Sequence, residues 1–136
     1  MDKLFVDTNI VIDLLQKRKE FYEEAQELFT LADKKKVKLF ISSLTIANTH
    51  FILSKYYNAN DARKILAKFK ILVEVLPLDD KIIELALTSA LKDFKDAIQF
   101  YTAIENNADL IVTRNKKDFR KQNIPILTAK EYLSRK

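Results

Sequence analysis

Asp7 is the first residue of the sequence with an evident chemical role. It directly follows the apolar run Leu4–Val6, which is short and rich in residues that favour strands, and it precedes Thr8 and Asn9, which are good helix N-cap residues. A buried strand of this kind would deliver the Asp7 carboxylate to the C-terminal edge of a sheet, and open α/β sheets bind their ligands at that edge. The alternative is that Asp7 only caps the helix that begins after it.

Two later stretches carry acids in a similar setting. Asp93 and Asp96 stand where a helical pattern opens, and Asn115 and Asp118 follow the apolar run at 110–112. In each pair the residues are three apart, which also suits an N-cap residue and a polar residue in the first helical turn. Capping therefore explains each pair taken alone. We expect the first and fourth strands to be adjacent and parallel, so that both end at the same edge of the sheet and bring their acids together there. Capping alone requires no such convergence.

Acids that converge at one edge need a partner of opposite charge. Two carboxylates repel by about 4 kcal/mol at a separation of about 4 Å in a surface-like dielectric. Mg²⁺ or Mn²⁺ offsets this repulsion, since hard cations prefer carboxylate oxygens. Such a metal suits phosphodiester hydrolysis, because it activates water and stabilises charge on phosphate. Basic side chains nearby would hold a polyanion by its phosphates, although a solvated surface run explains them almost as well. They are Arg114, Lys116, Lys117 and Arg120, with Lys121 next to them.

The composition narrows the class of protein further. The chain has 136 residues, of which 48% are hydrophobic and 32% charged, and this predicts one globular domain over residues 1–136. Its net charge of +5 suits an anionic partner such as nucleic acid. It has no Gly, which excludes Gly-rich phosphate loops and leaves turns to Asn, Asp and Lys. With no Cys and no apolar run near the roughly 20 residues of a membrane span, we expect a cytoplasmic protein without membrane association.

Strand-like and helix-like patterns alternate along the whole chain, which predicts βαβ units and a mainly parallel sheet. The expected strands cover residues 4–6, 39–41, 71–76, 110–112 and, more weakly, 125–127. The expected helices cover 10–15, 20–35 and 44–57, followed by helices capped by Asn60 or Asp61, by Asp79 or Asp80, by Asp93 and by Thr128.

Four stretches, in this order, resemble the motifs of the PIN-domain family, the metal-dependent ribonucleases that include VapC-type toxins of toxin–antitoxin pairs. The first is Val6-Asp7-Thr8-Asn9, and the third is Asp93-Phe94-Lys95-Asp96-Ala97. The second runs from Ser42 to Asn48, and the fourth from Ala108 to Phe119. An Asp-Thr-Asn after a strand is common, so one motif would be weak. Four motifs at plausible spacing, covering nearly the whole chain, are specific.

The resemblance implies a fold, a cofactor and a set of site residues. It implies a three-layer α/β/α architecture, with a five-stranded parallel sheet and helices on both faces, and Mg²⁺ or Mn²⁺ as cofactor. By position, Asp7 and Asp96 would be metal ligands, Asn115 stands where many members have a fourth acid, and Asp118 would supply that charge directly or through water. Thr8, Asn9, Asp93 and Thr113 would support this set. The family also implies an RNA substrate, an antitoxin partner and a homodimer.

Asn48 is where the chain departs from the family, because the second motif usually ends in Glu. An amide oxygen can ligate a metal, but it adds no negative charge and cannot act as a base at neutral pH. The sequence therefore leaves two functions open: a metal-dependent endoribonuclease, and a degenerate PIN domain that binds RNA or a partner protein without cleavage. Phosphatases of the haloacid dehalogenase type fit less well, since they need a second Asp where this chain has Asn9. Receiver domains need paired acids near the start of the chain, where the first motif supplies only one.

Two further polar residues are expected to lie outside the catalytic set. His50, the only His of the chain, comes two residues after Asn48 and would point about 200° away around the helix, which favours a structural role. Asp13 lies on the first expected helix, where it would pair with a Lys or border the pocket.

Overall fold

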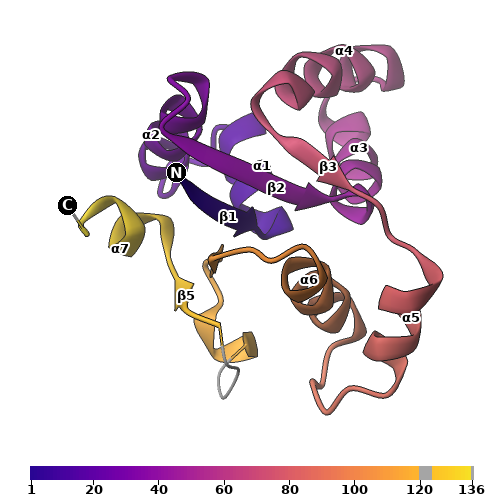
Figure 1. Cartoon of the computed structure of the whole chain (residues 1–136). Helices are drawn as coiled ribbons and strands as arrows, with labels where there is room; N and C mark the ends of the chain where they lie inside the picture. Colours follow the sequence, from indigo (N-terminus) through magenta and orange to yellow (C-terminus); the bar gives the residue numbers. More distant parts are fainter. Residues whose placement is uncertain (120–123, 136) are drawn as a thin grey trace.

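A computed structural model describes residues 1–119 and 124–135. Within these residues, five parallel strands form one sheet in the order β3-β2-β1-β4-β5, and helices cover both faces (Figure 1). This confirms the expected three-layer α/β/α architecture. β1 and β4 are adjacent and parallel, with Val6 opposite Val112, so both strands end at the same edge of the sheet.

The elements follow one another in the alternation that the sequence predicts. The strands are β1 (Asp2–Val6), β2 (Val37–Ser42), β3 (Glu74–Leu76), β4 (Leu110–Val112) and β5 (Ile126–Leu127). The α-helices are α1 (Thr8–Leu15), α2 (Tyr22–Asp33), α3 (Ser43–Tyr56), α4 (Ala59–Phe69), α5 (Asp80–Leu87), α6 (Phe94–Glu105) and α7 (Ala129–Leu133). The described residues also form the short 3₁₀ helices η1 (Lys70–Leu72) and η2 (Lys116–Phe119).

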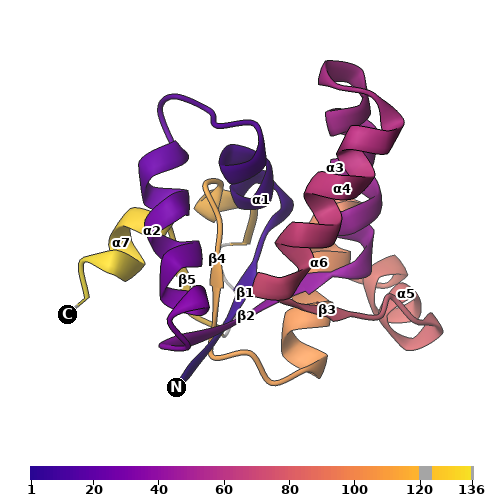
Figure 2. The same cartoon turned by 90° about the horizontal axis from the view of Figure 1, so that it is seen from above.

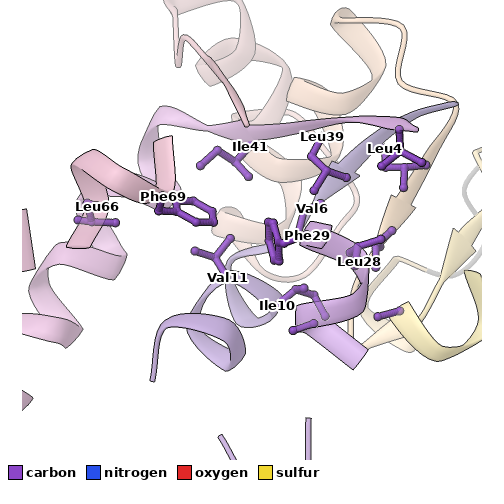
Figure 3. Close-up of a cluster of buried hydrophobic side chains, with 14 of the residues drawn as sticks. Leu4, Val6, Ile10, Val11, Leu28, Phe29, Leu39, Ile41, Leu66 and Phe69 are labelled. Atoms are coloured by element: carbon purple, nitrogen blue, oxygen red, sulfur yellow. The ribbon is translucent and has the colours of Figure 1, made fainter. Parts of the chain in front are cut away.

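Alternate residues of β1 face opposite layers, because side chains of a strand point to its two sides in turn. Leu4 and Val6 pack into a cluster with residues of α1, α2 and α4, drawn in Figure 3. Phe5 packs on the other face against Phe100 and Ala103 of α6. Figure 2 shows α1 and α2 on the side of the sheet away from α6. Burial of β1 on both faces fixes the direction in which its C-terminal residue, and the Asp that follows, must point.

Most helix starts lie where the sequence places them. Asp93 and Thr128 cap α6 and α7, and Asp79 caps α5. Asp7 itself is the N-cap of α1, as the capping alternative holds, so the helix begins at Thr8 and not at the expected residue 10, and Thr8 and Asn9 lie within it. In a chain without Gly, left-handed turns fall to Lys and Asn, as expected; among the described residues they are Lys17, Lys35 and Asn107.

Two local predictions are wrong. Asn58 caps α4, rather than Asn60 or Asp61, because its side chain reaches the Asp61 amide at 2.9 Å while Asn60 and Asp61 already lie within the helix. The third strand begins at Glu74 and not at Ile71, because η1 continues the end of α4 for one more turn. Neither difference moves a candidate site residue.

No helix within the described residues is both long enough and apolar enough to cross a membrane.

Candidate functional site

Asp7 lies at the C-terminal edge of β1, where β1 meets β4. Its backbone N–H donates to the Val112 carbonyl at 3.0 Å, which extends the pairing of the two strands by one residue. The residue is 7% exposed, and its Oδ1 accepts a 2.8 Å hydrogen bond from the Thr8 amide. Oδ2 accepts from Thr113 Oγ1 at 2.7 Å, and Asn9 Nδ2 lies 3.5 Å from the same oxygen. The helix start and the neighbouring strand thus fix both carboxylate oxygens.

Thr113 connects the first and fourth motifs through one hydroxyl group. This Oγ1 donates to Asp7 and accepts a 3.1 Å hydrogen bond from the Asn115 backbone N–H. The Thr113 amide pairs with the Leu127 carbonyl at 2.9 Å, which holds the residue to β5. Thr113 is fully buried, whereas Asn115 is exposed. The structure therefore brings Asn115 to the surface directly beside the Asp7 carboxylate's hydrogen-bond partner.

Gln99 is a residue of this region that sequence reasoning missed. Its side chain is almost fully buried on α6, and Nε2 donates to Thr8 Oγ1 at 2.8 Å and to Thr45 Oγ1 at 3.1 Å. The two hydroxyl groups are also 2.8 Å apart. The cluster joins the N-terminal ends of α1 and α3 to α6. An amide inside the apolar stretch Ala97–Phe100 was the available signal, since a buried amide needs polar partners.

Asn48 and Asp96 lie one helical turn from this cluster. Asn48 follows Thr45 by three residues on α3, and Asp96 precedes Gln99 by three on α6. Residues three apart share a helix face, so Asn48 and Asp96 lie on the faces that carry Thr45 and Gln99. Both are partly buried. Asp93 is exposed and caps α6 by accepting the Asp96 amide hydrogen at 3.0 Å, so it fixes the turn that carries Asp96.

Arg114 does not extend freely into solvent. Its Nε donates to Asp13 Oδ2 at 2.8 Å, and its guanidinium carbon lies 4.2 Å from the centre of the Phe21 ring. The Asp13 side chain is 1% exposed, and Arg18 Nη1 lies 3.9 Å from its other oxygen. Burial raises the pKa of Asp13 above its ordinary value, and the Arg114 and Arg18 charges oppose that shift. Asp13 thus has Arg partners, not the expected Lys.

The remaining predicted cations differ in their surroundings. Lys116 Nζ binds the Glu131 carboxylate of α7 at 2.9 and 3.0 Å, and both side chains are exposed. Lys117 is exposed. The Asp118 side chain, and Arg120 and Lys121 as a whole, lie outside the described residues. His50 lines a cleft of about 530 Å³ with residues of α3 and α4, and the residues that line this cleft include none of the candidate site residues.

The donor atoms of this region fit a hydrated Mg²⁺ or Mn²⁺. Asp7 and Asp96 offer carboxylate oxygens, and Asn48 and Asn115 offer amide oxygens, which are ligands of the hard type. Within the described residues, the buried oxygens Asn9 Oδ1 and Gln99 Oε1 accept no hydrogen bond. Water on a hydrated cation would donate to such oxygens. The described residues hold no cluster of three or more His, Cys, Asp or Glu, and the side chain of the candidate ligand Asp118 lies outside them.

The fold and these four motifs define a class of protein. A family model described as the PIN domain matches residues 3–117, and the chain belongs to this family. It is similar to Ribonuclease VapC1 of Aquifex aeolicus (strain VF5), with 28% identity over 142 residues that cover 98% of this chain and 95% of that protein.

Solved structures with a similar fold include toxin–antitoxin complexes. The chain resembles VapBC2 from Rickettsia felis, bound to a DNA fragment from its promoter, with a TM-score of 0.67, 25% identity and coverage of 91% of this chain and 96% of that one. It also resembles a toxin–antitoxin complex from Klebsiella pneumoniae, with a TM-score of 0.70, 26% identity and coverage of 93% and 97%.

Proposed function

We propose that this chain is a metal-dependent endoribonuclease of the VapC type that hydrolyses RNA phosphodiester bonds. It would act in the cytoplasm as the toxin of a toxin–antitoxin pair. The observation that carries the proposal is the Asp7 carboxylate at the end of β1, fixed by the Thr8 amide and the Thr113 hydroxyl. A carboxylate held in this way is oriented before any cation binds, which supports its proposed role as a metal ligand. Membership of the PIN family and the similarity to Ribonuclease VapC1 support the same function.

The proposed residue roles follow from the donor chemistry. Asp7 and Asp96 would hold Mg²⁺ or Mn²⁺, with Asn48, Asn115 and Asp118 contributing directly or through water. The bound cation would supply activated water and charge stabilisation at the scissile phosphate. Thr8, Asn9, Thr113 and Gln99 would keep the ligands oriented, and Asp93 would fix the first turn of α6. Lys116 and Lys117 would hold the RNA backbone from the rim by charge.

Labelled single-stranded RNA provides the test of this function. The chain should cleave it with Mn²⁺ and lose cleavage in chelator. Asp7→Asn and Asp96→Asn should each lower the rate by about two orders of magnitude, as is typical when one member of an electrostatic constellation is removed. Asp33→Asn is the matched control, because Asp33 is an exposed acid at the C-terminal end of α2. The chain then enters β2 at its N-terminal end, on the edge of the sheet opposite to the candidate site. The control variant should retain the wild-type rate.

Three results would contradict the proposal in different ways. Cleavage that persists in chelator would remove the metal from the mechanism. Equal rates in Asp96→Asn and Asp33→Asn would remove Asp96 from the site. RNA that binds tightly but stays intact with every divalent metal would favour the degenerate PIN domain, in which Asn48 has abolished catalysis.

The proposed toxin role implies a partner and an assembly. We expect a short neighbouring reading frame that encodes a DNA-binding antitoxin, by analogy with the toxin–antitoxin complexes that the fold resembles. Expression of this chain alone should arrest growth, and co-expression of that antitoxin should restore it. Sedimentation of the purified chain should give the mass of a homodimer. If an Asp7→Asn variant arrests growth as strongly as wild type, toxicity does not depend on the proposed RNA cleavage.

A further inference from the structure

Asp13 is a buried acid that the proposed reaction does not use. It lies on α1, and its side chain is 1% exposed. Its Oδ2 accepts a hydrogen bond from Arg114 Nε at 2.8 Å across 101 residues of sequence. A carboxylate in this environment is costly unless it is paired, so the pair holds Arg114 firmly to α1.

A second contact fixes the orientation of the Arg114 side chain. The guanidinium carbon lies 4.2 Å from the centre of the Phe21 ring, at a distance suited to a cation–π contact. The Arg114 side chain is 25% exposed, so both contacts form in a partly desolvated setting. Asp13 on α1 and Phe21 at the N-cap of α2 therefore hold the guanidinium from two elements.

Arg114 stands between two residues of the candidate site. Thr113 before it donates to the Asp7 carboxylate at 2.7 Å, and the Asn115 backbone after it donates to Thr113 Oγ1 at 3.1 Å. The segment 113–115 is thus tied to α1 twice, once through Asp7 at its N-cap and once through Asp13 further along the helix. The second tie acts on the residue directly after Thr113.

We propose that Asp13 and Arg114 are positioning residues of the active site. Their ion pair, supported by the Phe21 ring, holds residues 113–115 so that Thr113 orients Asp7 and Asn115 stays beside it. The proposal rests on the proposed ribonuclease function for the chemistry that is being positioned. It assigns Arg114 a role other than direct contact with the RNA backbone, and it assigns a role to Asp13, which the sequence left outside the site.

Asp13→Asn separates positioning from direct RNA contact. Asp13 is too deeply buried to touch RNA. If Arg114 bound phosphate directly, loss of the Asp13 charge would leave RNA binding equal or tighter and the turnover unchanged. If the pair positions the loop, kcat should fall about tenfold or more, because a small misplacement of reacting groups is costly, while KM stays within about threefold.

The experiment compares Asp13→Asn and Arg114→Lys with wild type by two independent measurements. The first is hydrogen exchange of the Asn115 amide in the metal-free protein, which should become at least about tenfold faster in both variants if the local hydrogen bond weakens by roughly 1.4 kcal/mol. The Ile41 amide of the buried strand β2 serves as internal reference. The second is the split between kcat and KM on RNA. Lys38→Met is the control, since Lys38 of β2 forms an exposed ion pair with Glu74 of β3, whereas residues 113–115 follow β4.

Each outcome decides the proposal. Wild-type exchange at Asn115 together with wild-type kcat in Asp13→Asn would overturn it, and so would a rise in KM with unchanged kcat. If the wild type cleaves no RNA, the proposed function fails, yet exchange at Asn115 still decides whether the pair positions the loop. If Asp13→Asn does not fold, Arg114→Lys carries the test, because Lys keeps the charge but lacks the planar fork that meets Asp13 and stacks on Phe21.

Discussion

The Thr113 hydroxyl donates a 2.7 Å hydrogen bond to Asp7 Oδ2, and so joins two motifs that lie 106 residues apart in the sequence. The bond forms because β1 and β4 are parallel neighbours that end together, with Val6 opposite Val112. Each residue is the first after its strand. Sheet topology, not local sequence, therefore creates this contact.

Thr113→Val tests the contribution of that hydroxyl to stability. Val has nearly the same shape but leaves the Asp7 carboxylate without this donor and the Asn115 amide without its acceptor. Hydrogen bonds to charged groups contribute about 1.5–3 kcal/mol, so the free energy of unfolding should fall by about 2 kcal/mol in urea. Thr102→Val is the control, because Thr102 is equally buried but donates only to the Ile98 carbonyl of its own helix. Equal losses of unfolding free energy in both variants would show that the hydrogen bond to Asp7 contributes no more to stability than the bond from Thr102 within its own helix.

Gln99→Leu tests the polar cluster under the candidate site. The substitution removes the donor to Thr8 and Thr45 but leaves their hydroxyl groups bonded to each other, so stability should change by only about 1 kcal/mol. The substitution should affect the orientation of the proposed metal ligands more than it affects stability. RNA cleavage should therefore drop about tenfold. Gln26→Leu, an exposed position on α2, controls for the change of residue type. Full activity in Gln99→Leu would limit Gln99 to a packing role.

The strands and most helix caps could be predicted because their causes are local. Leu4–Val6 is an apolar run that an acid ends, and Asp79, Asp93 and Thr128 each cap through a backbone amide three residues on. The α4 cap was misplaced because Asn58, Asn60 and Asp61 are all good capping residues. Which of the three becomes the N-cap depends on where the backbone turns into α4 after the end of α3, and the sequence does not show this.

The candidate site was predictable only in part, for a different reason. Motif order and strand ends indicate Asp7, and its partner Thr113 follows from the adjacency of β1 and β4. Gln99 and the Asp13–Arg114 pair depend on partners 54 to 101 residues away, which no local pattern encodes. From the sequence, Arg114 is expected to hold the RNA backbone by charge, because charge alone does not reveal a buried acid opposite it.

Tyr132→Phe tests how the C-terminal helix is held to the first strand. The Tyr132 hydroxyl donates to Asp2 Oδ2 at 2.7 Å, and burial, followed by this bond and the Asp2 charge, raises the pKa of Tyr132 from 10.0 to about 12. The folded state therefore favours the neutral phenol. This contribution, about 1 kcal/mol after solvent screening, is present below pH 10 and is lost as the pH rises through 12.

Urea unfolding at a series of pH values measures this effect. Wild type should lose stability between about pH 10 and 12, and Tyr132→Phe should be less stable at pH 8 and lose less over that range. Tyr57→Phe, at an exposed position after α3, should follow the wild-type curve. A Tyr132→Phe curve parallel to that of wild type would show that the pKa of Tyr132 is not coupled to folding.

Asn48→Glu tests the position where the chain departs from its family. If Asn48 faces Asp7 and Asp96, an added carboxylate there should lower the melting temperature in chelator, because like charges repel. With Mn²⁺ the extra ligand charge should raise affinity, and the bound metal should stabilise the fold by mass action. The variant should thus melt below wild type in chelator, gain more from Mn²⁺ and cleave RNA faster.

Asn60→Glu is the control for Asn48→Glu, since it adds the same charge at an exposed position of α4. It should show none of the metal-dependent gain. If Asn48→Glu raises metal affinity while cleavage stays at zero, the degenerate PIN domain is favoured. If it changes neither metal affinity nor melting, Asn48 does not face the site and the second motif has been aligned wrongly.

Paramagnetic broadening by Mn²⁺ tests most directly whether the motifs form one metal site. Trace Mn²⁺ added to ¹⁵N-labelled protein should first broaden the amide signals of residues 7–9, 48–49, 96–97 and 113–115, and the same titration of Asp96→Asn should need far more metal. Broadening confined to one of these segments, or spread over exposed acids such as Glu23 and Asp80, would contradict a shared site at the end of β1 and β4 and, with it, the proposed metal-dependent ribonuclease.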